Sequence, residues 1–149
     1  MSSADSINGI VDAILAIITA NFATLGITAV TETDEEPRYI EPSQAYVIPF
    51  VEGRDTIRTF AGGNEHTYPV NIVGFYKYDT IQAGLRPTRT YGLDALDLFS
   101  GSSGSLYSVT LSGPVGAEVG DASLEVGYWR NGDYIMHYWT LQLQIRQIA

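Results

Sequence analysis

The chain has 149 residues, of which 45% are hydrophobic and 17% charged, and it contains no cysteine. This length and composition predict a single globular domain over residues 1–149 that buries a core without disulfides or a structural metal. The absence of cysteine excludes thiol catalysis and cysteine-based zinc sites. The formal charge is −9 and Lys77 is the only lysine. This balance argues against nucleic-acid recognition, because proteins that bind phosphates need cations to release the phosphate counterions.

The first segment carries large apolar residues at helical spacing over residues 7–25, which predicts an amphipathic helix. Asp5 or Ser6 can cap its first turn, and Gly26 can adopt the left-handed conformation that ends it. The apolar run 10–18 has no preceding Lys or Arg and is shorter than the ~20 residues of a membrane span. We therefore expect neither a signal peptide nor a membrane helix.

A β-branched segment over residues 27–31 predicts a strand, and the charged residues 32–38 predict an exposed loop. The period then changes from helical spacing to two. The alternation over residues 45–51 predicts a strand that is at a sheet edge or bulged, because Pro49 cannot donate to a ladder.

Two further strands are predicted over residues 56–61 and 66–78, joined by a Gly-Gly-Asn turn at 62–64. In the longer strand the even-numbered residues from Tyr68 to Tyr78 share one face, and the odd-numbered residues share the other.

A second, shorter helix is predicted over residues 88–99, capped by Thr88 or Thr90, with Leu93, Leu96 and Phe99 on its buried stripe. A Gly/Ser linker follows at 101–105.

The last third of the chain predicts strands over residues 106–112, 123–129 and 134–145. The last two meet at a turn whose Asn131-Gly132 pair is typical of a tight hairpin. In the final strand His137 and the alternating apolar residues around it are expected on the buried face, namely Ile135, Trp139, Leu141, Leu143 and Ile145. The order of elements predicts an α+β fold, with an N-terminal amphipathic helix and a second short helix packed on a mainly antiparallel β-sheet.

Sequence patterns for catalysis or cofactor binding are absent, including the phosphate-binding loop, the nucleophile elbow, the zinc-protease helix and the dinucleotide fingerprint. His66 and His137 have no ligand partners at metal-binding spacing, and Asp94 and Asp97 fit a solvated helix face. We expect no catalytic residue, no cofactor and no metal, so the protein is not expected to be an enzyme.

Two features leave alternatives open. The ten tyrosines, many of them on predicted strands, fit either cross-strand pairs on a half-exposed sheet or a subunit interface. The acidic run 32–36 is either a solvated loop or a surface past which DNA slides without adhering.

This layout resembles that of the tail terminator, or tail-completion, proteins of long-tailed bacteriophages, which join head to tail. The features that carry the resemblance span nearly the whole chain: the helix 7–25, the acidic loop, the strand 45–51, the hairpin closing at 68–75, the helix before Gly101 and the final strand 134–145. The glycine-rich stretch 113–121 departs from the pattern, because it is longer than a simple strand connection.

The resemblance implies a structural virion protein that forms a homo-oligomeric ring, a hexamer, at the head-proximal end of a tail. The ring would end tube polymerisation and contact the tail tube protein and the head–tail connector or neck protein. It would be assembled in the host cytoplasm, without a membrane partner, and DNA would only pass through its lumen.

On this reading Arg54 and Arg58 are candidates for the ring interface. The candidates for lumen-facing carboxylates are Glu32, Asp34, Glu35, Glu36, Glu52 and Asp55. The alternatives are another neck, head-completion or baseplate protein, and a small α+β ligand-binding domain or enzyme with a Tyr-lined pocket.

Overall fold

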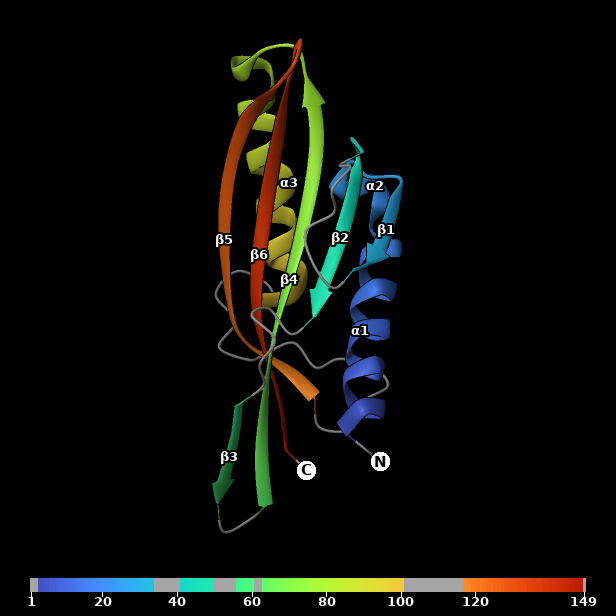
Figure 1. Ribbon diagram of the computed structural model, residues 1–149, viewed down its shortest axis with the longest axis vertical. Coiled ribbons are helices and arrows are strands. Elements are labelled where there is room, and N and C mark those ends of the chain that lie inside the picture. The colour runs from blue at the N-terminus through green and yellow to red at the C-terminus, as the bar shows by residue number, and fades with distance from the viewer. Residues whose placement is uncertain (1–2, 34–40, 50–55, 61–62, 101–116, 149) are drawn as a thin grey trace.

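The structure is a computed structural model that describes residues 3–33, 41–49, 56–60, 63–100 and 117–148 (Figure 1). The helices are α1 (Ser3–Thr19), α2 (Phe22–Leu25) and α3 (Ile81–Ser100), and the strands are β1 (Ala29–Glu32), β2 (Gln44–Pro49), β3 (Thr56–Phe60), β4 (Gly63–Tyr78), β5 (Ala117–Asn131) and β6 (Tyr134–Ile148). The strands form one sheet in the order β1-β2-β4-β6-β5, with β3 paired to β4 outside this path. β1 and β2 are parallel and the other pairs antiparallel. The α+β prediction is confirmed.

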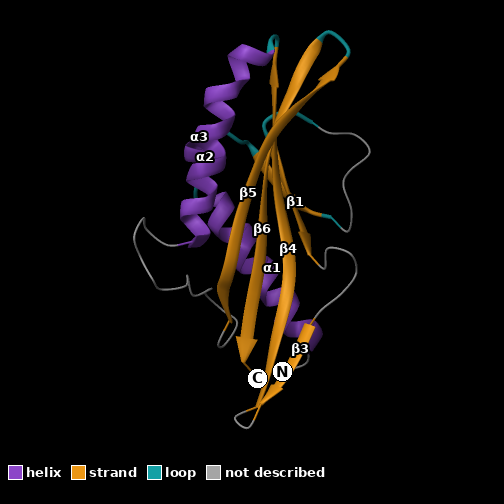
Figure 2. Cartoon of the chain, turned by 90° about the vertical axis from the view of Figure 1, so that its left-hand side faces the viewer, coloured by secondary structure: helices purple, strands orange, loops and turns teal. Residues whose placement is uncertain are grey.

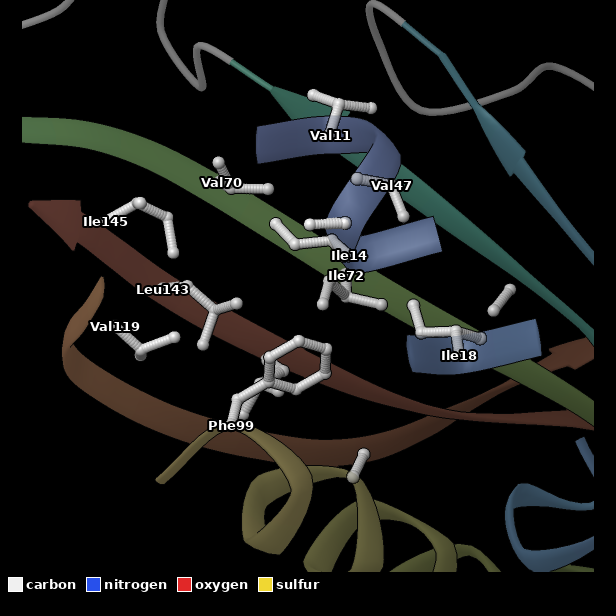
Figure 3. Packing of buried hydrophobic residues seen from close by; sticks show 14 of the residues in the cluster. Val11, Ile14, Ile18, Val47, Val70, Ile72, Phe99, Val119, Leu143 and Ile145 are labelled. Atoms are coloured by element: carbon white, nitrogen blue, oxygen red, sulfur yellow. The ribbon is translucent and has the colours of Figure 1, made fainter. Parts of the chain in front are cut away.

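The helices all lie on one side of the sheet (Figure 2). The apolar stripe of α1 and the inner face of α3 pack onto the sheet there, and Figure 3 shows part of this core. Its buried residues include Ile10, Ile14, Ile18, Val47, Val70, Ile72, Phe99, Leu141, Leu143 and Ile145. We call the opposite side of the sheet the open face, because no helix of the described residues covers it.

The alternation expected in the two long central strands is confirmed. Tyr68, Val70, Ile72 and Tyr76 of β4 belong to the core beneath the helices, while Val73 and Phe75 belong to a second cluster on the open face. In β6 the predicted set from Ile135 to Ile145 is buried, with His137 among its members. Each central strand therefore contributes apolar residues to both faces of the sheet.

The first helix differs from its prediction at both ends. It begins at Ser3, so Asp5 and Ser6 lie inside it and not at its cap. It ends at Thr19, where Asn21 turns back and its Nδ2 donates to the Ile17 carbonyl at 2.7 Å. The amide side chain thus satisfies a carbonyl of the last turn, and the remaining residues form the separate short α2.

Gly26 adopts φ 64°, the left-handed conformation predicted for it, and ends α2. A Cβ at this position would lie 2.5 Å from Cζ of Tyr91. Glycine is therefore required both by the backbone and by the ring packed against it.

The prediction for the start of α3 was wrong. The helix begins at Ile81, and its cap is Thr80, whose Oγ1 accepts a hydrogen bond from the Ala83 amide at 3.0 Å. Pro87 lies inside the helix instead of before it. Leu93 is 47% exposed and not part of the buried stripe, whereas Gly92 is buried against Trp139 and Leu124.

The strand containing Pro49 is internal, between β1 and β4, rather than at an edge. The Val47 carbonyl accepts a hydrogen bond from the Thr33 amide, so the polar groups of Val47 and, two residues on, of Pro49 face the β1 side. β1 ends at Glu32, level with Val47. Pro49 therefore lies beyond the last pair of the β1–β2 ladder, so its missing amide hydrogen costs no hydrogen bond to β1.

The hairpin predicted between β3 and β4 is present, with Phe60 opposite Gly63. In the β5–β6 hairpin Asn131 lies opposite Tyr134, so the central turn residues are Gly132 and Asp133 instead of the Asn-Gly pair. Gly132 has φ 65°, as required at the first central position of a Gly-X turn. The predicted linker 101–105 and strand 106–112 lie outside the described residues.

Candidate functional site

The open face has an aromatic end near the β5–β6 turn. Tyr46, Val73, Phe75 and Met136 are buried there, and Ile48, Trp129, Tyr134 and Tyr138 pack around them half-buried. Phe75 meets Trp129 edge-on with ring centroids 5.8 Å apart. Lys77 places its Nζ 4.5 Å from the centroid of the Tyr134 ring. These contacts match the cross-strand aromatic pairs expected of a sheet face that has one apolar and one wet side.

The rest of the open face is polar. The register places Asn71, Thr140 and Gln142 in adjacent rows, and Gln142 and Gln144 are exposed. Arg146 of β6 places its Nη2 3.1 Å from Oε1 of Glu118 on the edge strand β5, in an exposed ion pair. Amides, hydroxyls and exposed ions can hydrogen-bond a macromolecular surface, but they supply no activated nucleophile or proton carrier.

A series of buried hydrogen bonds, the buried polar chain, joins the sheet to the helical layer. Trp139 Nε1 donates to Tyr76 Oη at 2.8 Å, and Tyr76 Oη donates to the Leu25 carbonyl. Tyr91 stacks on Tyr76 with centroids 4.8 Å apart. Burial raises the pKa of the Tyr76 hydroxyl above its usual range, so this hydroxyl stays protonated. It therefore links the indole of Trp139 to the carbonyl of Leu25.

His137 is buried against α3, where Gly84 leaves room for its ring. Its ring meets Tyr78 edge-on at 5.2 Å and tilts against Tyr128 at 5.5 Å. None of the described residues forms a hydrogen bond with the Nε2 atom of His137. Burial lowers the pKa of His137, and a backbone interaction with Thr80 opposes this shift in part. The prediction that this histidine is structural agrees with its place in the core.

The residues predicted for the ring lie mostly outside the described part of the chain: Asp34, Glu35, Glu36, Glu52, Arg54 and Asp55. Glu32 is the last residue of β1 and is exposed. Arg58 lies in β3, opposite Glu65 of β4. The predicted interface and lumen groups therefore remain expectations.

The carboxylates and histidines weighed for chemistry lie on α3, β4 and β6. Asp97 is exposed and Asp94 half-buried on α3. Across the residues that the structure describes, no three His, Cys, Asp or Glu side chains gather as metal ligands. His66 pairs with Ile57 and Gln147 in the backbone ladder, and its side chain is outside the description.

A groove of roughly 590 Å³ follows the outer flank of α1. Its described lining residues are Gly9, Asp12, Ala13, Ala16, Ile17, Ala20 and Asn21, with no tyrosine among them. This groove is therefore not the Tyr-lined pocket expected if the chain were a small ligand-binding domain or enzyme. Among the described helices, none is long and apolar enough to cross a membrane.

The sequence could have indicated the polar half of the open face, because Gln142 and Gln144 alternate with the buried residues of β6. It could not indicate that both helices cover the same side of the sheet. A scan against protein-family models finds no match, and no curated protein matches the chain.

Proposed function

We propose that this chain is a structural virion protein, the tail terminator of a long-tailed phage. Copies of it form a closed ring, a hexamer, at the head-proximal end of the tail. The ring ends polymerisation of the tail tube and joins the tail to the head–tail connector. It performs no catalysis and requires no cofactor.

One observation carries this proposal: a sheet with helices on one face only, whose other face mixes an aromatic cluster with exposed amides and ions. Such a subunit has its described helices on one side and leaves a partly polar sheet surface available to neighbours on the other. The order of elements along the chain agrees with the layout expected from the sequence. Aromatic groups that are half-buried in a single copy are typical of surfaces that pack further in an assembly.

The charge distribution supports a role beside DNA without binding it. The chain has a formal charge of −9. Of the described exposed carboxylates, Glu32, Asp121 and Glu125 lie on the two outer strands of the sheet. A wall of like charge repels the phosphates of a passing duplex and releases no counterions, so the duplex does not adhere.

The test of this function is tube capping. Purified protein is added to the tail tube subunit of the same virus while the subunit polymerises, and the tubes are measured in negative stain. A terminator shortens the tubes in proportion to its concentration and is seen as a ring at one end. Tubes of unchanged length, with no ring attached, would contradict the proposal. Rings that form yet leave tubes unchanged would favour another neck or head-completion protein.

A further inference from the structure

We propose that the outer edge of β5 is the assembly surface of this protein, and that its occupant is β3 of a second copy. Each copy would thus extend the sheet of its neighbour head to tail. This inference rests on the proposed ring, and it identifies the two edges that meet in it.

The outer edge of β5 has free backbone groups. β5 pairs with β6 along one side, and no other strand of the described residues pairs with it. The two-residue turn makes Asn131 and Tyr134 the hydrogen-bonded pair that closes the hairpin. Alternate residues therefore direct their amides and carbonyls outward, and these include Leu124, Val126 and Tyr128.

This edge lacks most of the protection that single-copy proteins give an outer strand. β5 is 15 residues long and contains no Pro or Lys, and its bulge lies near one end, between Val119 and Asp121. Val126 is 40% exposed and Tyr128 47% exposed. A long edge strand with exposed apolar residues and neither Pro nor Lys is a template for pairing with another strand.

The opposite edge of the sheet offers a matching strand. β3 pairs with β4 alone, on the side of β4 away from β6 and β5. Thr56 of β3, Thr67, Arg146 and Glu118 of β5 lie in one row across the sheet. β3 is thus level with the first residues of β5, and a second copy brings its β3 beside Asp121 and Glu125 when it is displaced along β5 by several residues, as in a closed arrangement whose strands are tilted to its axis. The new pair would be antiparallel, since β5 runs with β4 and β3 runs against it.

Charge favours this pairing over a two-fold pair of β5 strands. β5 carries Glu118, Asp121 and Glu125 and one cation, Arg130, whereas the only charged residue of β3 is Arg58. A β5–β5 pair would set three carboxylates against three, which is unfavourable for directly opposed strands. A β5–β3 pair brings a cation to an acidic strand. It also uses two different patches, as a closed ring of more than two copies requires.

Single-cysteine variants test the edges directly, because the natural chain has no cysteine. Chains with Ser123→Cys in β5 are mixed with chains with Thr56→Cys in β3, because the register places both positions on the open face, and a short bis-maleimide cross-linker is added. We expect cross-linked dimers in the mixture and none from the Ser123→Cys chain alone. The matched control pairs Thr56→Cys with Thr90→Cys, on the outer side of α3, and should give no dimers.

The outcomes separate this inference from the proposed function. Dimers from the Ser123→Cys chain alone would mean two-fold pairing and overturn the inference. Rings of the expected mass without a β5–β3 cross-link would overturn the inference and leave the ring function standing. A protein that stays monomeric at every concentration would overturn both.

Charge reversal provides a second test. Arg58→Glu should weaken assembly by roughly tenfold or more in the dissociation constant, while Arg86→Glu, on an exposed part of α3, should not. Adding Asp121→Lys and Glu125→Lys to Arg58→Glu should restore assembly. Restoration shows that the first variant folds. Failure of the combined variant to assemble, or normal assembly of Arg58→Glu alone, would contradict the pairing.

Discussion

Trp139 is the residue at which the sheet, α3 and the buried polar chain meet. Its indole is fully buried, lies over Gly74 and donates a hydrogen bond to the hydroxyl of Tyr76. A Cβ on Gly74 would lie 2.4 Å from the indole Cε2, so the glycine is part of the same packing arrangement. The position was predictable from the alternation of β6, but the glycine beneath it was not, since only the three-dimensional register places Gly74 opposite Trp139.

Replacing Trp139 with alanine tests this packing. We expect Trp139→Ala to lower the free energy of unfolding by ~3–5 kcal/mol, because it loses apolar burial and leaves a cavity. Denaturant unfolding followed by circular dichroism measures the loss. Trp129→Ala, at a half-buried position of the open face, is the control and should cost less. A loss within ~0.5 kcal/mol of zero for Trp139→Ala would contradict its place in the core.

His137 makes stability depend on pH. Burial lowers its pKa in the folded chain below the ordinary value of 6.5. Between the folded pKa and 6.5 the unfolded chain therefore binds more protons. The buried, neutral His137 therefore contributes to stability above pH 6.5. This contribution is lost as pH falls through the pKa of the folded chain, and the free energy of unfolding then changes by at most about 1.4 kcal/mol per pH unit.

The measurement is the free energy of unfolding at about pH 7.5 and about pH 5.5, above the range where most carboxylates titrate. The wild-type chain should lose more stability over this interval than His137→Gln, in which the buried group does not titrate. The other histidine, His66, is the same in both chains, so the comparison isolates His137. Equal losses in the two chains would show that His137 is not held neutral by burial.

At the scale of elements, periodicity predicted strands better than helix ends. β4 and β6 alternate between two apolar faces, so most of each strand was predictable from the sequence. Their outer ends were not, because β4 begins at Gly63, inside the predicted turn 62–64, and β6 continues beyond 145 to Ile148. The start of α3 was not predictable in this way. A proline usually marks a helix boundary, but Pro87 lies inside α3, and the helix is held against the sheet before and after it. Which side of the sheet stays open depends on where both helices dock, and no local pattern carries that information.

The cap of α3 gives a test of its true start. Thr80→Ala removes the hydroxyl that accepts from the Ala83 amide, and we expect a loss of about 0.5–2 kcal/mol in unfolding free energy. Thr90→Ala, in an exposed part of the same helix, should be neutral or slightly stabilising. Hydrogen exchange should accelerate in the first turn of Thr80→Ala. Unchanged exchange there would show that the Thr80 hydroxyl does not cap the helix.

For the whole molecule, the proposed function assigns the acidic residues at and after the end of β1 a place beside passing DNA. If they line the lumen, reversing Glu32, Glu35 and Glu36 to lysine should make rings retain duplex DNA at low salt and release it as salt rises. Wild-type rings should retain none under either condition. Retention is measured by filter binding or by co-sedimentation.

A matched control changes the net charge by the same amount elsewhere, through Asp12→Lys, Asp94→Lys and Asp97→Lys on α1 and α3. These rings should not retain DNA inside the lumen. Reversed rings that assemble normally and still ignore DNA at low salt would place the acidic segment on the outside of the ring. Retention by the control alone would place the helices on the lumen side.

The central claim is that this chain works as a closed ring. Sedimentation equilibrium of the purified protein over a wide range of concentration measures this most directly. We expect a species of six times the 16.3 kDa chain mass, with no open-ended series of larger oligomers, because ring closure uses both edges of every sheet. A monomer at all concentrations, or a two-fold dimer that grows no further, would contradict it.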